Sequence, residues 1–135
     1  MSTLQTSSPT VLLTRLAWST FRRLKPEVLG MKLKEYFALR QLSDEGHMSQ
    51  ASLCSGMNVD ANYMTLMLND LEAAGWVERR RDPADRRRHI VELTAEGAEA
   101  IERAERAIDQ MEDEVLGPLS GEERETLREL MARTI

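Results

Sequence analysis

The stretch at residues 78–93, ERRRDPADRRRHIVEL, gathers six arginines around two aspartates and one proline. The β-favourable runs WVERR and HIVEL flank its central segment DPAD, and Asp and Pro are typical of tight turns. Val91 and Leu93 alternate with Glu92, which indicates a strand with one buried face. The stretch therefore predicts a β-hairpin that carries arginines at its tip.

The residues before the hairpin predict two short helices joined by a tight connection around GMNV. Ser49 can cap the segment QASLCSG, and Asp60 can cap a longer helix after it. Such a pair of helices is typical of a helix-turn-helix. Two further helices are expected upstream, over residues 9–29 and 33–45, and Pro26 either interrupts the first of them or begins its next turn.

The residues after the hairpin predict two more helices. Thr94 can cap a long helix that extends to about Leu116, and Ser120 with Glu123 has the spacing of a capping box that begins a last helix. Apolar residues of the long helix are spaced three and four apart, like a short coiled-coil seam. They are Ile101, Ala104, Ile108, Met111 and Val115. The element order α-α-α-α-β-β-α-α predicts a mainly α, winged helix-turn-helix fold.

Charge is unevenly distributed along the 135 residues, whose formal net charge is −5. Within residues 79–89, six arginines against two aspartates give +4, which leaves −9 for the remainder. Within residues 98–125, ten acidic residues against three arginines give −7. The net charge alone argues against a nucleic-acid-binding protein, but a basic patch on an acidic body argues for one.

Length and composition favour a small intracellular protein. The chain suits a single domain, and its first eight residues, MSTLQTSS, are polar and expected to be disordered. No secretory signal and no apolar run long enough to cross a bilayer is visible, and the single Cys54 cannot form an internal disulfide. We therefore expect a soluble, cytoplasmic protein without membrane association.

The helix predicted after Asp60 has one apolar face and one face free to enter a DNA major groove. At about 100° per residue, four residues share the apolar face: Met64, Met67, Leu68 and Leu71. On the opposite face, Asn62 and Asn69 can make bidentate hydrogen bonds to adenine, and Thr65 can contact a thymine methyl group or a phosphate. This face carries no Lys or Arg, so a solvated face on a core helix is the competing interpretation.

The hairpin arginines are suited to the narrow minor groove, where the negative potential of DNA is strongest. Asp85 is placed to hold Arg86 or Arg87 in an extended conformation before DNA binds. The flanking arginines are expected to meet phosphates or to pair with Asp82 and Glu78; they are Arg79, Arg80, Arg81 and Arg88. A solvated turn with weak surface ion pairs is the alternative, but the position directly after a helix-turn-helix favours a DNA-contacting wing.

The segment LEAAGWVERRRDPADRRRHIVELTAEG, residues 71–97, resembles the wing signature of the MarR family of winged-helix transcriptional regulators. The match includes the acid-Pro-x-Asp-Arg-Arg turn and the Leu-Thr-x-x-Gly that opens the long helix, and the order of elements agrees from about Pro9 onward. The resemblance implies dimerisation helices at residues 9–30 and 94–135 around a DNA-binding domain at residues 31–93, after the disordered tail at residues 1–8.

The resemblance further implies a homodimer that binds a pseudo-palindromic operator in double-stranded DNA, with one helix in the major groove and the wing in the minor groove. The wing Asp and Arg of the family correspond to Asp85 and Arg87, with Arg86 beside them. Ser49 matches a position that commonly meets a phosphate. Many members lose DNA affinity when a small aromatic ligand binds between the two regions, so a repressor released by such a ligand is expected.

The sequence departs from the family on the outward face of the helix predicted after Asp60, which corresponds to the family's recognition helix. Members often carry Arg or Lys there, whereas this chain has Ala61 and Leu66. We therefore expect affinity to depend on the wing, or Asn62 and Thr65 to read an A·T-rich site. Redox-sensing members place a reactive cysteine in the first helix, whereas Cys54 lies in the third, where a small core residue is the simpler interpretation.

Four of the six aromatic residues lie in the first two predicted helices: Trp18, Phe21, Tyr36 and Phe37. They predict either core and dimer packing or the wall of a ligand pocket, in which Arg22 or Arg40 would pair with an anionic ligand.

Catalytic and metal sites find little support in the sequence. The two histidines, His47 and His89, fall in separate elements, and no phosphate-cradling glycine loop or nucleophile motif is present. We therefore expect no enzyme, no metal and no cofactor. Two alternatives to a DNA-binding repressor remain: a degenerate family member that acts through a protein partner, and a small-ligand binding protein without a role on DNA.

Overall fold

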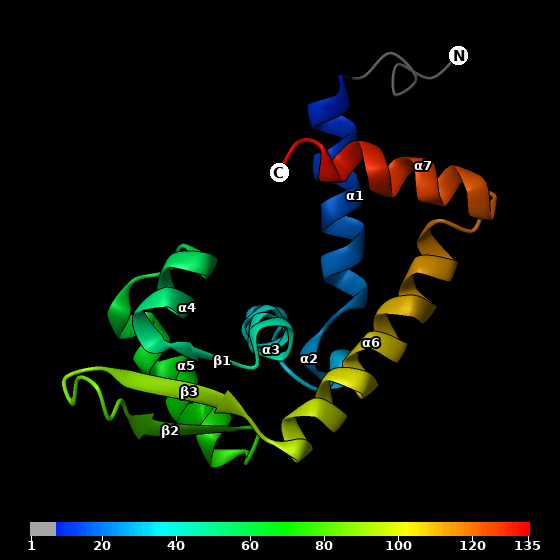
Figure 1. Cartoon of the computed structure of the whole chain (residues 1–135). Coiled ribbons are helices and arrows are strands. Elements are labelled where there is room, and N and C mark those ends of the chain that lie inside the picture. The colour runs from blue at the N-terminus through cyan, green and yellow to red at the C-terminus, as the bar shows by residue number, and fades with distance from the viewer. Residues whose placement is uncertain (1–7) are drawn as a thin grey trace.

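The computed structural model describes residues 8–135, so the predicted disorder of the N-terminal tail falls, apart from Ser8, outside the described residues (Figure 1). The Ser8 hydroxyl accepts a hydrogen bond from the Val11 amide at 3.4 Å and caps α1, Pro9–Arg23. Pro26 both interrupts the predicted first helix and begins the next one, because it is the first residue of the short α2, Pro26–Leu29. A proline has no amide hydrogen to donate and is well tolerated at the start of a helix.

A winged helix-turn-helix follows and confirms the predicted fold. It consists of α3 (Leu33–Glu45), β1 (His47–Ser49), α4 (Gln50–Met57), α5 (Ala61–Ala73), β2 (Val77–Arg81) and β3 (His89–Leu93). The three strands form an antiparallel sheet in the order β1-β3-β2, in which Val91 pairs with Met48 on one side and Arg79 on the other. The sequence analysis missed β1, because three residues with a polar residue at each end carry no alternation to detect.

The C-terminal part consists of α6, Ala95–Val115, and α7, Gly121–Ala132. Both predicted caps are confirmed: the Thr94 hydroxyl accepts from the Gly97 amide at 3.0 Å, and Ser120 and Glu123 bond each other reciprocally. Figure 1 shows α1 and α7 together at one end of the molecule and the hairpin at the other, with α6 running between the two regions. No helix within residues 8–135 is both long and apolar enough to span a membrane.

The core lies between the winged helix and α6. The predicted apolar face of α5 is buried in full, through Met64, Met67, Leu68 and Leu71. The seam on α6 packs against helices of the same chain, with α1, α2 and α3 as its neighbours. Ile101, Ala104 and Met111 of this seam are buried. The buried face of α5, the recognition helix, therefore packs against the core, and its opposite face is exposed.

The start of α6 is locked onto the turn between α5 and β2. The Thr94 hydroxyl donates to the Gly75 carbonyl at 2.6 Å, and the Thr94 amide donates to the Trp76 carbonyl at 3.0 Å. A Cβ atom on Gly97 would overlap that same Trp76 carbonyl and approach Leu93 Cδ1 to 2.7 Å. The Leu-Thr-x-x-Gly motif thus fixes the hairpin relative to α6: its threonine bonds the turn, and its glycine leaves space for it.

Candidate nucleic-acid interface

The wing tip is a tightly bonded loop. The Asp82 amide donates to the Arg88 carbonyl at 2.9 Å, and the Arg88 amide donates to the Asp85 carbonyl at 2.9 Å. The Asp82 side chain accepts from the Ala84 amide at 2.9 Å. These bonds join the two sides of the tip, because every one of them is made within residues 82–88.

Asp85 holds Arg87, one of the two arginines that the sequence offered. Asp85 Oδ1 accepts from the Arg87 amide at 3.1 Å and from Arg87 Nε at 3.2 Å. These bonds from Arg87 hold the pKa of the Asp85 carboxyl below its usual value. The Arg87 side chain is nevertheless 92% exposed, so its guanidinium is oriented by Asp85 and free to contact another molecule.

The ion-pair partners predicted for Arg79 and Arg80 are wrong. Arg80 bonds Glu92 on the neighbouring strand at 2.6 Å, and Arg79 reaches back to Glu72 on α5 at 3.2 Å. Hydrogen bonds from these arginines lower the pKa of both glutamates. Each pair therefore contributes slightly to the free energy of unfolding at pH values above the usual carboxyl pKa. This contribution is lost as the pH falls through the lowered pKa of the glutamate. Arg80 stays exposed despite its ion pair, as do four other arginines of the hairpin: Arg81, Arg86, Arg87 and Arg88.

The outward face of α5 is exposed as predicted, but two of its polar side chains are already engaged. Asn69 Oδ1 accepts from Arg79 at 2.6 Å, so only one lone pair of this oxygen is left for an adenine. The Thr65 hydroxyl donates to the Ala61 carbonyl at 2.9 Å and accepts from Gln50 Nε2 at 3.1 Å. Asn62 is exposed and keeps its readout role as a prediction. The roles of Gln50 and Arg79 in positioning this face were not visible in any sequence pattern.

Ser49 lies at the foot of the wing but is only 7% exposed. Its hydroxyl accepts from the Ser52 amide at 3.1 Å and donates to the Ser52 hydroxyl at 2.8 Å, which caps α4. It borders a hollow of about 270 Å³ between the starts of α4 and α5 and the wing, which Arg88 and His89 also line. A phosphate contact by Ser49 remains a prediction.

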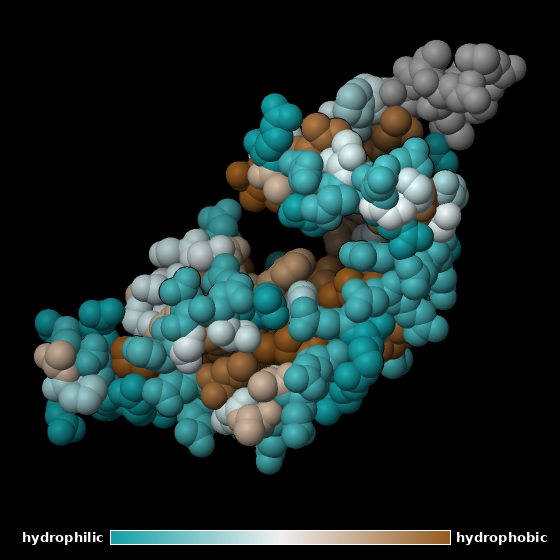
Figure 2. Space-filling view, turned by 45° about the vertical axis from the view of Figure 1, so that its right-hand side comes forward, coloured by the Kyte–Doolittle hydropathy of each residue, from teal (hydrophilic) through white to brown (hydrophobic). Residues whose placement is uncertain are grey.

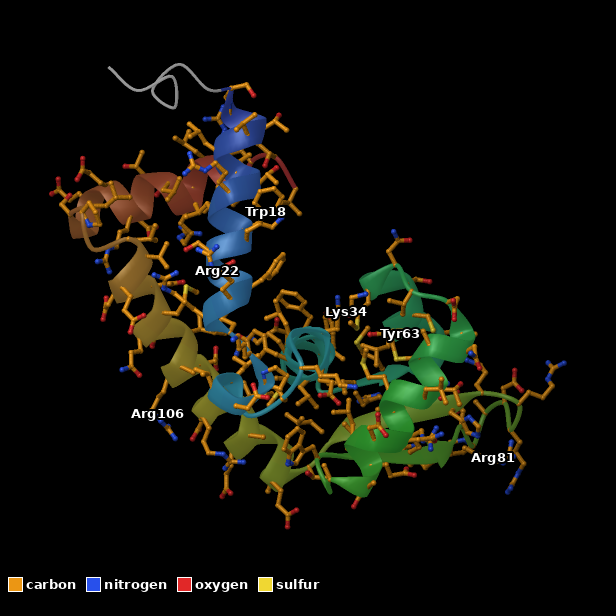
Figure 3. All side chains as sticks on the ribbon, turned by 180° about the vertical axis from the view of Figure 1, so that it is seen from behind. Trp18, Arg22, Lys34, Tyr63, Arg81 and Arg106 are labelled. Carbon is orange, nitrogen blue, oxygen red and sulfur yellow. The ribbon has the colours of Figure 1, made fainter. Side chains whose placement is uncertain are left out.

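The predicted ligand residues fall into two groups. Tyr36 donates to Glu105 on α6 at 3.3 Å, Arg40 pairs with the same carboxylate at 3.6 Å, and burial followed by the Glu105 charge raises the pKa of Tyr36. Arg22 instead lines a hollow of about 390 Å³ between α1 and α6. Trp18 and Phe21, which precede Arg22 on α1, are both exposed. Figure 3 shows Trp18 one turn from Arg22.

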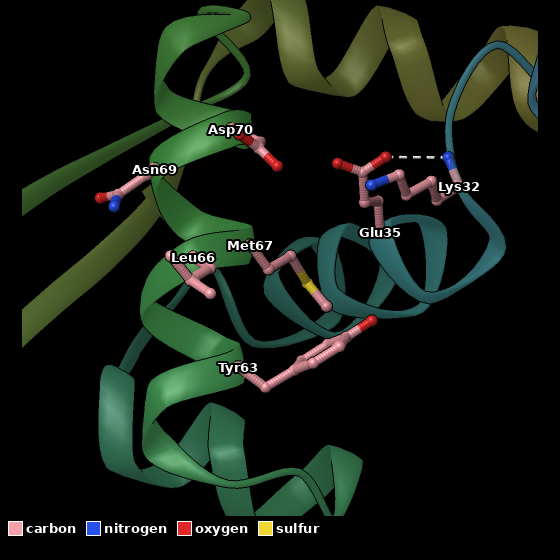
Figure 4. Close-up of a pocket in the computed structure, with 7 residues that line it drawn as sticks. All are labelled: Lys32, Glu35, Tyr63, Leu66, Met67, Asn69 and Asp70. Carbon is pink, nitrogen blue, oxygen red and sulfur yellow. Dashed lines mark hydrogen bonds between the residues drawn. The ribbon is translucent and has the colours of Figure 1, made fainter.

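The largest hollow described, about 470 Å³, lies between α3 and the buried side of α5 (Figure 4). Tyr63, Met67 and Asp70 point from α5 toward α3, where the Lys32 amide donates to Glu35 at 2.8 Å. Asn69 points away from α3, and Leu66 stays on the open side of the helix. Leu66 and Asn69 also border this hollow, so it opens at the edge of the outward face of α5.

Cys54 is partly buried, and burial raises the pKa of its thiol, which disfavours the reactive thiolate. Within residues 8–135, no three His, Cys, Asp or Glu side chains converge as a metal site would require.

Known proteins share this architecture. The model of the MarR family matches residues 31–89. The chain is 33% identical to the transcriptional regulator HosA of Escherichia coli O111:H- over 111 residues, which cover 82% of each protein. It is 37% identical to the uncharacterized HTH-type transcriptional regulator YdgJ of Bacillus subtilis strain 168 over 115 residues, 79% of this chain and 70% of YdgJ.

A solved structure of a mutant Escherichia coli MarR complexed with operator DNA superposes with a TM-score of 0.77 at 25% identity. The superposition covers 93% of this chain and 92% of that one. Sequence relatives and structural neighbours agree with the wing signature and with the observed fold. The chain therefore belongs to the MarR family, and it is a DNA-binding transcriptional regulator rather than an enzyme.

Proposed function

We propose that the protein is a cytoplasmic homodimer that represses transcription by occupying a pseudo-palindromic operator, until a small aromatic acid releases it. The observation that carries the proposal is the exposed Arg87 guanidinium, held by Asp85 at the tip of a wing that adjoins the outward face of α5. A structural neighbour, mutant MarR, was solved with operator DNA, which supports the same docking mode.

In this mode α5 enters the major groove and presents Asn62, Thr65 and Asn69 to the base edges. The wing enters the adjacent minor groove with Arg87, and Arg86 lies beside it. Arg81 and Arg88, which are exposed and form no ion pair within the described residues, meet phosphates. The acidic α6 remains on the side away from the DNA, so that like charges are kept apart.

The dimer is supported by apolar side chains that the single chain leaves exposed. Figure 2 shows apolar patches at the end of the molecule where α1 and α7 lie. The exposed residues there include Val11, Leu12, Leu13, Leu130, Met131 and Ile135. Exposed apolar patches of this kind are typical of interaction sites. A second copy covers them with the same patches and relates two recognition helices by a two-fold axis, which matches a palindromic operator.

Selection of bound sequences from a random duplex library tests the function. We expect the purified protein to sediment as a dimer of the 15.4 kDa chain and to enrich an inverted repeat. Because several phosphates are neutralised, the logarithm of affinity should fall steeply as the logarithm of salt concentration rises. A folded dimer that enriches no sequence would contradict the proposal and favour a partner-binding or ligand-carrying protein.

The ligand proposal rests on the positive hollow between α1 and α6. Arg22, Arg23 and Lys25 line it, although Arg23 also faces Glu114 at 3.6 Å, and Trp18 is 59% exposed one turn before Arg22. Three cations suit the carboxylate of an aromatic acid. The second group, Tyr36 and Arg40, already neutralises Glu105 and is the less favourable site.

Titration with salicylate should therefore quench tryptophan fluorescence with saturation at about millimolar concentrations or below. Salicylamide has the same ring without the carboxylate and should bind at least about tenfold more weakly. Saturating salicylate should also raise the Kd for the operator. Equal binding of the acid and the amide, or ligand binding without any change in operator affinity, would contradict a repressor released by an acid.

A further inference from the structure

The outward face of α5 carries an exposed leucine. Leu66 is 57% exposed, and it also borders the hollow between α5 and α3 (Figure 4). Exposing a leucine costs free energy, and a major groove offers an apolar group to cover it only at the methyl group of thymine. Guanine, adenine and cytosine present polar groups that a leucine would leave without hydrogen-bond partners.

Thr65, the neighbouring residue on this face, has a hydroxyl group that is already engaged in hydrogen bonds within the protein. Its hydroxyl hydrogen is donated to the Ala61 carbonyl, and its oxygen accepts from Gln50 on α4. One lone pair remains, so the group with which Thr65 can make new contacts is chiefly its γ-methyl. Asn69, one turn on, is likewise drawn toward Arg79. The centre of the reading face is therefore more apolar than its composition indicates.

We propose that Leu66 and the γ-methyl group of Thr65 read the operator through thymine methyl groups, with Gln50 as the residue that positions Thr65. The proposal rests on the proposed function and adds the chemistry of its readout. It assigns specificity to apolar contacts on α5 and leaves the charge attraction to the wing. The preferred half-site then contains thymines at the two positions under these side chains.

Replacing thymine with uracil in the selected operator removes one methyl group and keeps every hydrogen-bonding group. At a contacted position, this change should weaken binding of the wild-type protein about fourfold. At the position under Leu66, the same change should not weaken binding by the Leu66→Ala variant. At the position under Thr65, it should not weaken binding by the Thr65→Ser variant, which keeps the hydroxyl bonds. Two matched variants should respond to uracil like the wild type.

The first control is Val28→Ala, which truncates an apolar side chain of nearly equal exposure, 58%, on α2. The second is Thr126→Ser on α7, where the threonine makes the same local bond, to the Glu122 carbonyl at 3.0 Å. Each control removes apolar atoms from an exposed side chain on a helix other than the one proposed to read DNA. Circular dichroism of all four variants should match the wild type, because every substituted side chain is exposed.

Two outcomes would overturn the proposal in distinguishable ways. If the protein selects an operator and binds its uracil-substituted forms as tightly as the thymine form at every position, the methyl readout is wrong and the proposed function stands. If uracil lowers the affinity of the wild type, Leu66→Ala and Thr65→Ser equally, the effect comes from DNA shape and not from these side chains, and the proposal is again wrong. If no operator is selected, both the readout and the proposed function fail.

Discussion

Replacing Arg87 with alanine should weaken operator binding at least about tenfold and leave the fold unchanged. The Arg87 side chain is 92% exposed, and its only described partner is Asp85 two residues before it, so the core does not depend on it. Because Asp85 already fixes the guanidinium, little side-chain entropy is lost when the wing enters the minor groove. The measurement is the Kd for the selected operator at one fixed salt concentration.

Arg106→Ala is the matched control for this variant. Arg106 is exposed on α6, away from the wing, and its loss changes the net charge by the same amount (Figure 3). We expect it to change the Kd little, and Asp85→Asn to fall between it and Arg87→Ala, because the guanidinium is kept but no longer held by a charge. An equal loss for Arg87→Ala and Arg106→Ala would mean that net charge, and not the wing, sets the affinity.

The Asp85–Arg87 pair could be predicted from the sequence because its two residues are neighbours in one turn. The same is true of the helix caps: Thr94 and Ser120 each act on the amide three residues later. Such contacts depend only on local backbone geometry, which residue type and spacing determine.

Contacts between elements could not be predicted in this way. Arg79 bonds Glu72 and Arg80 bonds Glu92, and both pairings depend on how β2 lies against α5 and β3. The interaction of Tyr36 with Glu105 joins residues 69 positions apart. The short β1 is a strand only because β3 lies beside it. A single sequence contains no signal for such pairs, since charged residues occur on every exposed face.

The Gln50–Thr65 hydrogen bond is the most consequential contact of this kind. From sequence, Thr65 has a free hydroxyl and a methyl group, and both are candidates for readout. The structure commits the hydroxyl to the protein, which changes the expected specificity from hydrogen bonding toward methyl contact. The chemistry of the interface is therefore set by a residue on α4 that does not itself lie on the reading face.

Gly97→Ala should lower the free energy of unfolding by about 3 kcal/mol, a large part of the stability of a small domain. The added Cβ atom would overlap the Trp76 carbonyl, which is backbone and already accepts a bond from the Thr94 amide, so it cannot rotate away as a side chain would. Helix propensity would by itself favour alanine by up to about 1 kcal/mol. The steric term opposes it and should prevail.

Urea unfolding at equal chain concentration measures this effect, because the stability of the proposed dimer would depend on concentration. Gly121→Ala is the control: it lies at the first turn of α7, where an added Cβ atom meets nothing within 4 Å, and it should be neutral or slightly stabilising. A Gly97→Ala protein as stable as the wild type would show that α6 can shift away from the turn. In that case operator affinity should still fall, because the shift moves the hairpin and α5 relative to the proposed dimerisation helices.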